Sequence, residues 1–135
     1  MKRSAGICLA LVAGLFSTLA RAQDAAGIWQ SQPGEEGTSI QVELLPCSDS
    51  AMLCGKIVNT VGTPPEDPDY LIGKVMIDRM ASDGPGKWSG GTIWAPDEDE
   101  TYDAELELKD ANTLSVSGCI LGGLICRGQD WFRVP

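Results

Sequence analysis

Alternation of apolar and polar residues with a period of two is the main pattern of this chain. It is clearest over residues 101–109, where the apolar positions are Tyr102, Ala104, Leu106 and Leu108 and the positions between them are charged. A strand with one buried face and one wet face has this pattern, which is typical of antiparallel sheets. Residues 113–119 continue the alternation after a short turn at 110–112. Pairing Leu108 with Leu114 puts both apolar faces on one side of a predicted hairpin.

Two pairs of cysteines predict two covalently closed hairpins. Beyond residue 22 the cysteines are Cys47, Cys54, Cys119 and Cys126, and six residues separate the members of each pair. An even count in an exported chain indicates two disulfides, and four cysteines allow three pairings. We expect Cys47–Cys54 and Cys119–Cys126, because each pair can close a hairpin. The alternative is a four-thiolate zinc site, whose ligands usually have about two to four residues between them.

The hydrophobic pattern supports both pairings, because each brings apolar residues opposite one another. The predicted facing pairs are Cys47 with Cys54, Leu44 with Ile57, Cys119 with Cys126, Leu114 with Trp131 and Val116 with Gln129. The last face also carries Arg127 and Arg133. Long basic side chains on an apolar face usually lie at a barrel mouth or over an aromatic ring.

The remaining strands complete a predicted all-β fold. Further strands are expected at 27–31, 38–45, 52–59, 73–80 and 88–94. Three prolines make 62–69 a loop, and no segment shows a helical period. About eight short strands joined mostly by tight turns predict a small antiparallel up-and-down barrel. A Gly-x-Trp at Gly27–Trp29 and an arginine near the other end, Arg133, resemble the residues that often close lipocalin-like barrels.

The first 22 residues have the layout of a secretory signal peptide. A basic start is followed by an apolar stretch from Ile7 to Leu19 and then by Ala20-Arg21-Ala22. The apolar run is too short to anchor in a bilayer, so the mature protein is expected to have no membrane span. An amphipathic first helix of the domain is the alternative. We therefore predict a signal peptide at 1–22 and one β-barrel domain at 23–135, placing the protein in the periplasm or outside the cell.

Charge and composition exclude several functions. The chain has 10 basic and 19 acidic residues, and residues 1–22 hold three of the basic ones, which leaves a mature net charge of −12. Such a surface disfavours nucleic acid and anionic membranes. The chain has no histidine, so a Ser-His-Asp or Cys-His mechanism is excluded. We expect no catalytic residues, no cofactor and no metal.

Aromatic residues form the candidate ligand site. Four tryptophans occur after residue 22, and in the predicted register Trp88 and Trp94 share a face with Tyr102, with Gly90 and Thr92 between them. Large residues around small ones can leave room for a ligand inside a barrel, although plain packing uses the same alternation. The candidate ligand-binding residues are Trp29, Trp88, Trp94, Tyr102, Trp131 and Arg133.

Two acidic clusters lie in predicted loops, at 66–69 and 97–100. Oxygen-rich loops can bind calcium, but neither cluster has the spacing or the central glycine of the twelve-residue calcium loop. Paired carboxylates can also hydrolyse glycosides, but a barrel this small offers little wall for a cleft. The simpler interpretation is solvated turns.

The mature chain resembles the bacterial envelope family known as domain of unknown function 2147. The matching segments are 27–29, Cys47, 53–57, 71–73, 87–93, Pro96, 101–102, Leu114, 118–119 and 127–134. The turn at 97–100 departs from the Asp-Gly usual in that family, and the proline-rich loop lacks its basic residues. The resemblance implies an exported, lipocalin-like antiparallel barrel. It implies no catalytic residue, because the family has no assigned activity.

Two functions follow as hypotheses. The first is a non-catalytic envelope module that binds a small apolar or aromatic ligand inside the barrel or at its mouth. The second is a protein-interaction module, such as a periplasmic protease inhibitor or a partner of an envelope protein, that docks through the proline-rich loop at 63–69, where prolines order the backbone before binding.

Overall fold

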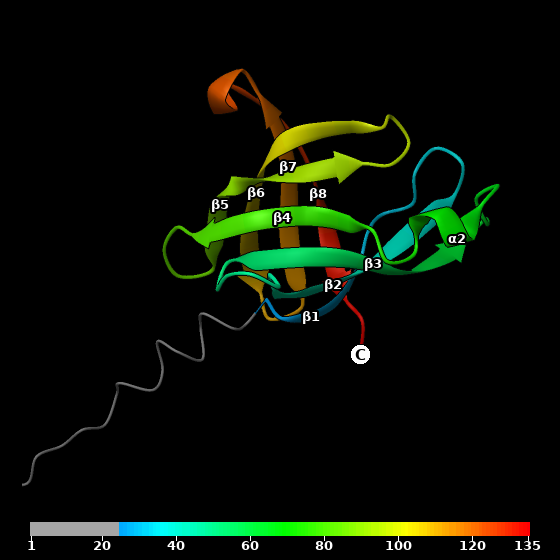
Figure 1. Cartoon of the computed structure of the whole chain (residues 1–135), viewed down its shortest axis with the longest axis horizontal. Coiled ribbons are helices and arrows are strands. Elements are labelled where there is room, and N and C mark those ends of the chain that lie inside the picture. The colour runs from blue at the N-terminus through cyan, green and yellow to red at the C-terminus, as the bar shows by residue number, and fades with distance from the viewer. Residues whose placement is uncertain (1–24) are drawn as a thin grey trace, which may run out of the picture.

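The computed structural model describes residues 25–135, which form one closed antiparallel barrel (Figure 1). The predicted signal peptide lies outside the described residues. The strands are β1 (Gly27–Gln30), β2 (Thr38–Pro46), β3 (Leu53–Gly62), β4 (Val75–Ser82), β5 (Lys87–Ala95), β6 (Glu100–Asp110), β7 (Thr113–Ile120) and β8 (Ile125–Arg133). Each strand pairs with the next, and β8 pairs with β1, so the predicted all-β up-and-down barrel is confirmed.

Two short helical elements interrupt the meander. The helix α2 (Pro68–Leu71) follows the proline-rich loop, with Pro68 in its first turn, where the missing N–H costs nothing. A 3₁₀ turn, η1 (Leu121–Gly123), joins β7 to β8. The sequence pattern predicted neither element, because four and three residues are too few to show a helical period.

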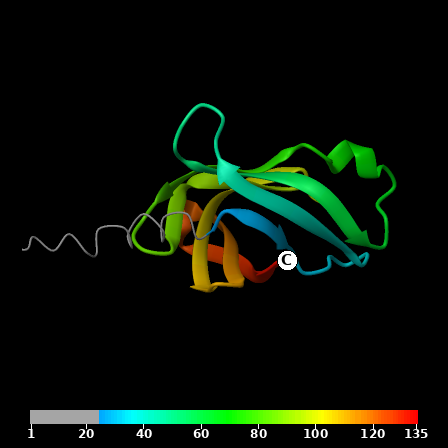
Figure 2. The ribbon, with the colours of Figure 1, turned by 90° about the horizontal axis from the view of Figure 1, so that it is seen from below.

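The two ends of the barrel differ. The N-terminal residues 25–26 and the turns 47–52, 83–86 and 111–112 lie at one end, which we call the closed end. The loops 31–37, 63–74, 96–99 and 121–124 lie at the other, the open end. Figure 2 shows β1 beside the C-terminal end of β8, where only Trp29↔Arg133 and Gln30↔Phe132 are paired.

The core fills the barrel toward the closed end. Its fully buried large side chains include Trp29, Trp131, Leu44, Ile57, Ile77, Met80 and Leu114. The indole N–H of Trp29 donates to the Ala25 carbonyl at 2.9 Å, so this buried polar group is satisfied. Inward-facing residues alternate with outward ones along most of the strands, as the period of two predicts, but β4 and β5 break the alternation.

The last two hairpins have the predicted registers. Leu108 faces Leu114, Val116 faces Gln129, and Cys119 faces Cys126. Both predicted disulfides, Cys47–Cys54 and Cys119–Cys126, are present. Local turns and a covalent closure together leave these strands one arrangement that keeps the apolar faces inward.

The predicted register of the β2–β3 hairpin is wrong by two residues. Leu44 faces Gly55 rather than Ile57, and Cys54 faces Leu45. Cys47 lies opposite Met52, because its N–H donates to the Met52 carbonyl at 2.8 Å. The turn between these positions, 48–51, is therefore shorter than a Cys47–Cys54 pairing would require. A shift of two keeps every side chain on its face, so the disulfide still forms.

The predicted face of Trp94 is also wrong. Gly90 adopts φ +81°, and the register of β5 on β6 shifts between Trp88 and Gly91. Trp88 pairs with inward-facing Leu106, but Trp94 pairs with outward-facing Thr101. The bulge puts Gly91 and Ile93 inward in place of Gly90 and Thr92, because one extra residue reverses the alternation beyond it.

Gly91 is required at the point where the β5 backbone lies close to the backbone of its neighbour β4. A Cβ at this position would lie 2.2 Å from the Asp78 carbonyl oxygen, whereas a Cβ at Gly90 would meet nothing within 4 Å. We expect Gly91→Ala to lower the free energy of unfolding by about 3 kcal/mol or more, because the backbones must separate. Gly90→Ala is the matched control and should cost about 1–2 kcal/mol through its positive φ alone. Urea denaturation of both variants checks this, and equal losses would contradict it.

Candidate ligand-binding site

A cavity of about 520 Å³ opens at the open end of the barrel, between β4 and β8. Its apolar floor is made by Met76, Ile93 and Val116, which are all buried. One wall is formed by the β5–β6 hairpin, and the other is formed by the β7–β8 hairpin. The size falls in the range of about 300–1,000 Å³ that is usual for pockets holding small organic ligands.

Small side chains in neighbouring strands create this space. Gly118 of β7 faces Ala104 on one side and Arg127 on the other. A Cβ at Gly118 would approach Ile93 and Tyr102 no closer than 3.4 Å, so the glycine leaves room rather than relieving a clash. The predicted register, with Leu108 opposite Leu114, already pairs Ala104 with Gly118. The sequence did not show that these small residues leave a cavity, because that depends on which end of the barrel is open.

The β5–β6 loop forms an acidic side of the rim. The indole N–H of Trp94 donates to Asp99 at 2.9 Å, and the Tyr102 hydroxyl donates to Glu98 at 2.6 Å. Asp97 and Glu98 line the cavity mouth. Two of the four carboxylates predicted as solvated turn residues therefore hold the loop against the aromatic residues of the strands.

The Glu98 carboxylate changes the acidity of Tyr102. Its hydrogen bond raises the pKa of the phenol above the ordinary value, with smaller contributions from burial and from the negative charges of Glu98 and Glu100. The nearby Arg127 charge lowers the pKa by a lesser amount. Tyr102 thus remains a neutral donor throughout the physiological range.

The opposite side of the rim is formed by β8. Arg127 and Gln129 line the cavity from this strand. The Gln129 side-chain oxygen accepts from the Gln32 backbone N–H at 2.9 Å and from the Trp131 indole N–H at 2.9 Å, which ties the 31–37 loop to β8. The rim therefore presents a guanidinium opposite carboxylates. Sequence reasoning placed both β8 residues on the inner face but did not include them among the site residues.

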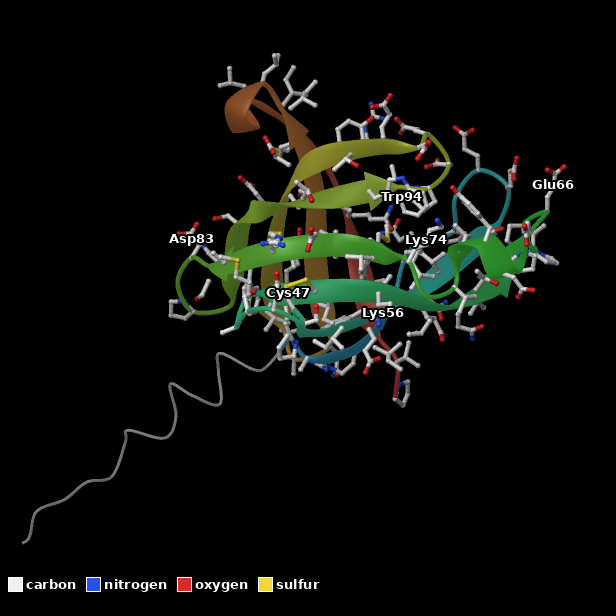
Figure 3. All side chains as sticks on the ribbon, viewed as in Figure 1. Cys47, Lys56, Glu66, Lys74, Asp83 and Trp94 are labelled. Atoms are coloured by element: carbon white, nitrogen blue, oxygen red, sulfur yellow. A yellow bond between two sulfur atoms is a disulfide. The ribbon has the colours of Figure 1, made fainter. Side chains whose placement is uncertain are left out.

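Only two of the six predicted site residues line the cavity. Tyr102 lines it from the inner face of β6, whereas the outward-facing Trp94 borders it only at the mouth, next to the 95–98 rim. Figure 3 shows Trp94 beside Lys74, whose ammonium lies 5.9 Å from the Trp94 ring centre and 4.2 Å from that of Tyr70. These cation–π contacts hold the segment around α2 against β5. Trp29, Trp88 and Trp131 are buried in the packed core instead.

Arg133 lies at the closed end. Its guanidinium is 4.3 Å from the centre of the Trp29 ring and donates to the Ala26 and Ala111 carbonyls, each at 2.8 Å. Arg133 thus covers the Trp29 ring at the closed end, as expected for a basic residue on an apolar face. The cavity mouth lies at the opposite end of the barrel.

The described residues offer no group of three carboxylates close enough to share a metal ion. The two clusters of ligand atoms found among residues 25–135 each consist of a disulfide with Asp78 or Glu105. Disulfide sulfurs lack the thiolate charge that binds zinc. The paired cysteines thus replace the alternative of a four-thiolate zinc site.

The sequence of the barrel matches a known protein family along its whole length. The model of the family described as "Uncharacterized protein conserved in bacteria (DUF2147)" matches residues 27–133. The chain belongs to the DUF2147 family. This confirms the resemblance seen in the sequence, and the match spans all eight strands of the barrel.

A solved structure confirms the type of barrel. Protein HP1028 from Helicobacter pylori, described as belonging to the lipocalin family, is similar to this DUF2147 chain with a TM-score of 0.66 and 17% identity. The similarity covers 82% of this chain and 83% of that one. The shared fold is thus lipocalin-like.

No curated protein matches the sequence at a significant level. Among the described residues, no helix has the length and apolar character needed to cross a membrane.

Arg133 provides a test that separates barrel closure from ligand binding. We expect Arg133→Ala to lower the free energy of unfolding by about 1–2 kcal/mol, because two charge-assisted hydrogen bonds and a partly exposed cation–π contact are lost. Affinity for any ligand in the cavity should stay within about twofold, since the cavity lies at the other end. Thermal denaturation and a ligand titration of the same variant check both parts. A large loss of affinity without loss of stability would restore Arg133 as a ligand residue.

Tyr102 provides a test of the acidic rim. In a Tyr70→Phe background, where Tyr102 is the sole tyrosine, we expect Glu98→Ala to move the Tyr102 titration to lower pH. The raised folded-state pKa stabilises the fold fully below the unfolded value of about 10, and this stabilisation is lost as the pH rises through the folded-state pKa. Near-ultraviolet absorbance against pH measures the shift. Glu105→Ala on the outer face is the control, and an equal shift there would argue against a specific Tyr102–Glu98 bond.

Proposed function

We propose that this DUF2147 protein is a non-catalytic carrier that binds a small amphiphile in the cavity at the open end of its barrel. The observation that carries the proposal is the cavity itself, with an apolar floor of Met76, Ile93 and Val116 below a rim of charged and hydrogen-bonding groups. Apolar walls with a few placed polar groups are the usual composition of small-ligand sites.

The chemistry of the rim supports a ligand with a polar head. An apolar chain or ring would lie against the floor, and its polar group would reach Arg127, Gln129 or the Asp97–Glu98 side. The mixed charges favour a head with both donors and acceptors, or an anionic head paired with Arg127. This refines the expected small apolar or aromatic ligand.

The covalent structure supports an extracytoplasmic location. Two disulfides persist only in an oxidising compartment in most bacteria. Together with the signal-peptide pattern of residues 1–22, they favour the periplasm as the place where the carrier acts. Docking of an envelope protein or a protease through 63–69 stays a prediction of the sequence.

Native mass spectrometry of the mature protein from a periplasm tests the proposal directly. We expect an additional mass of one small organic molecule per chain. A bare polypeptide mass, together with no response of tryptophan fluorescence to medium-chain fatty acids or aromatic amphiphiles, would contradict it. Trp94→Phe assigns the optical signal, since Trp94 is the tryptophan that lines the cavity.

Filling the cavity should weaken ligand binding without unfolding the barrel. Gly118→Val adds a Cβ, which would make ordinary contacts with Ile93 and Tyr102, and two γ methyl groups, which must occupy the ligand space. From a dissociation constant on the order of micromolar, we expect a loss of at least about tenfold. Ser115→Val, on the outward face of the same strand, is the matched control. Isothermal titration with a medium-chain fatty acid measures both, and equal affinities would exclude this cavity as the site.

A further inference from the structure

The tip of the β7–β8 hairpin, residues 120–125, is an exposed apolar surface, and its two leucines, Leu121 and Leu124, lie outside the lining of the cavity. Figure 1 shows it projecting away from the barrel. Its exposed fractions are 44% for Ile120, 66% for Leu121, 84% for Leu124 and 54% for Ile125. Single exposed apolar residues are ordinary, but four contiguous ones on a small protein mark an interaction surface.

The fold holds this tip in an exposed shape. The Cys119–Cys126 disulfide closes the hairpin directly below it, and Ile120 pairs with Ile125 above the disulfide. The turn itself needs left-handed backbone at Leu121 (φ 56°), Gly122 and Gly123. A leucine adopts left-handed backbone only at a cost in free energy, and its exposed apolar side chain adds a second cost in water. Leu121 is therefore unfavourable at this position unless its side chain makes a contact with another molecule.

Charge separates the tip from the rest of the molecule. Residues 117–126 contain no charged side chain, although the chain has a net charge of −9. Arg127, directly after the disulfide, is the first charged residue beyond the tip on the β8 side. The tip itself therefore carries no charge; the Glu105 carboxylate lies beside the disulfide at its base, and other exposed apolar side chains, such as Val75 and Phe132, lie elsewhere on the barrel.

The size and shape of the tip favour lipid over protein. A stable protein interface takes roughly 20–30 residues from each partner with complementary shape, and a convex tip of six residues offers neither. A lipid layer needs no shape complementarity, since apolar side chains insert among fluid acyl chains. Ile120 and Ile125 also line the cavity, so the apolar surface runs without a break from tip to cavity.

We propose that the tip at 120–125 docks the protein on the surface of a lipid layer with neutral or zwitterionic headgroups. The docking goes beyond the proposed carrier function and needs no ligand in the cavity. An acidic body is repelled by anionic lipid, so the preference for neutral headgroups follows from the same charge distribution.

The test is flotation of the mature, disulfide-bonded protein with phosphatidylcholine vesicles. We expect binding that falls at least tenfold in the Leu121→Ser/Leu124→Ser double variant. The matched control is Val75→Ser/Phe132→Ser, which removes apolar side chains that are 49% and 54% exposed elsewhere on the barrel and should bind as wild type does. Adding phosphatidylglycerol should weaken binding at low salt, and salt should restore it.

A second measurement places the contact. A tryptophan introduced by Leu124→Trp should shift its fluorescence to shorter wavelength on addition of vesicles, whereas one introduced by Phe132→Trp should not. Absence of vesicle binding, binding that is equal in the two double variants, or no shift in Leu124→Trp would overturn the proposal. A dimer in sedimentation that the Leu121→Ser/Leu124→Ser variant abolishes would instead assign the tip to a protein interface. Gly118→Val should still dock, so failure of the carrier function and failure of docking give different results.

Discussion

The seam between β1 and β8 is the contact on which the rest of the structure depends. An antiparallel sheet of eight strands has two edges unless it closes, and here two paired positions join the first strand to the last. Trp29 is completely buried at this seam, with Arg133 across its ring. The guanidinium also binds the Ala26 and Ala111 carbonyls, so one residue connects the N-terminal segment, the β6–β7 turn and the last strand. The aromatic core can pack only because this closure holds its two sides together.

The shortness of the same seam explains why the barrel is solid at one end and hollow at the other. β1 ends at Gln30, whereas β8 begins at Ile125, so the first part of β8 has β7 as its neighbour and no pairing with β1. Side chains from Gln32 continue the contact a little further. Beyond it, Gly118 and Ala104 supply too little volume to fill the interior. The large core residues gather toward the closed end, and the cavity is the space that they do not reach.

The β7–β8 hairpin contributes to both proposed functions. Its inner face carries Val116, Gly118 and Gln129 into the cavity, and its tip carries the exposed leucines. The disulfide lies between the two regions and makes the hairpin a rigid projection of the wall. A ligand leaving the cavity past Ile120 and Ile125 would stay on apolar surface, which is the physical link between a carrier and a docking tip. The acidic β5–β6 loop, held by Trp94 and Tyr102, faces this hairpin across the mouth.

The sequence by itself determined the strands, the barrel and the covalent closures of this protein. The registers of the last two hairpins were predictable residue by residue, because alternation, short turns and paired cysteines are all local, and a slip of one residue would expose the core face. The role of Arg133 over an aromatic ring was also expected from a basic residue on an apolar face. The tertiary structure alone decided where the cavity lies and which aromatic residues reach it. Trp94 changed faces because Gly91 must approach the Asp78 carbonyl of β4, and that contact joins strands whose registers no local pattern specifies. Trp29, Trp88 and Trp131 belong to the packed core and not to the cavity wall. The reason is that the β1–β8 pairing closes the barrel at one end, and the inward-facing residues near that end are the ones that pack.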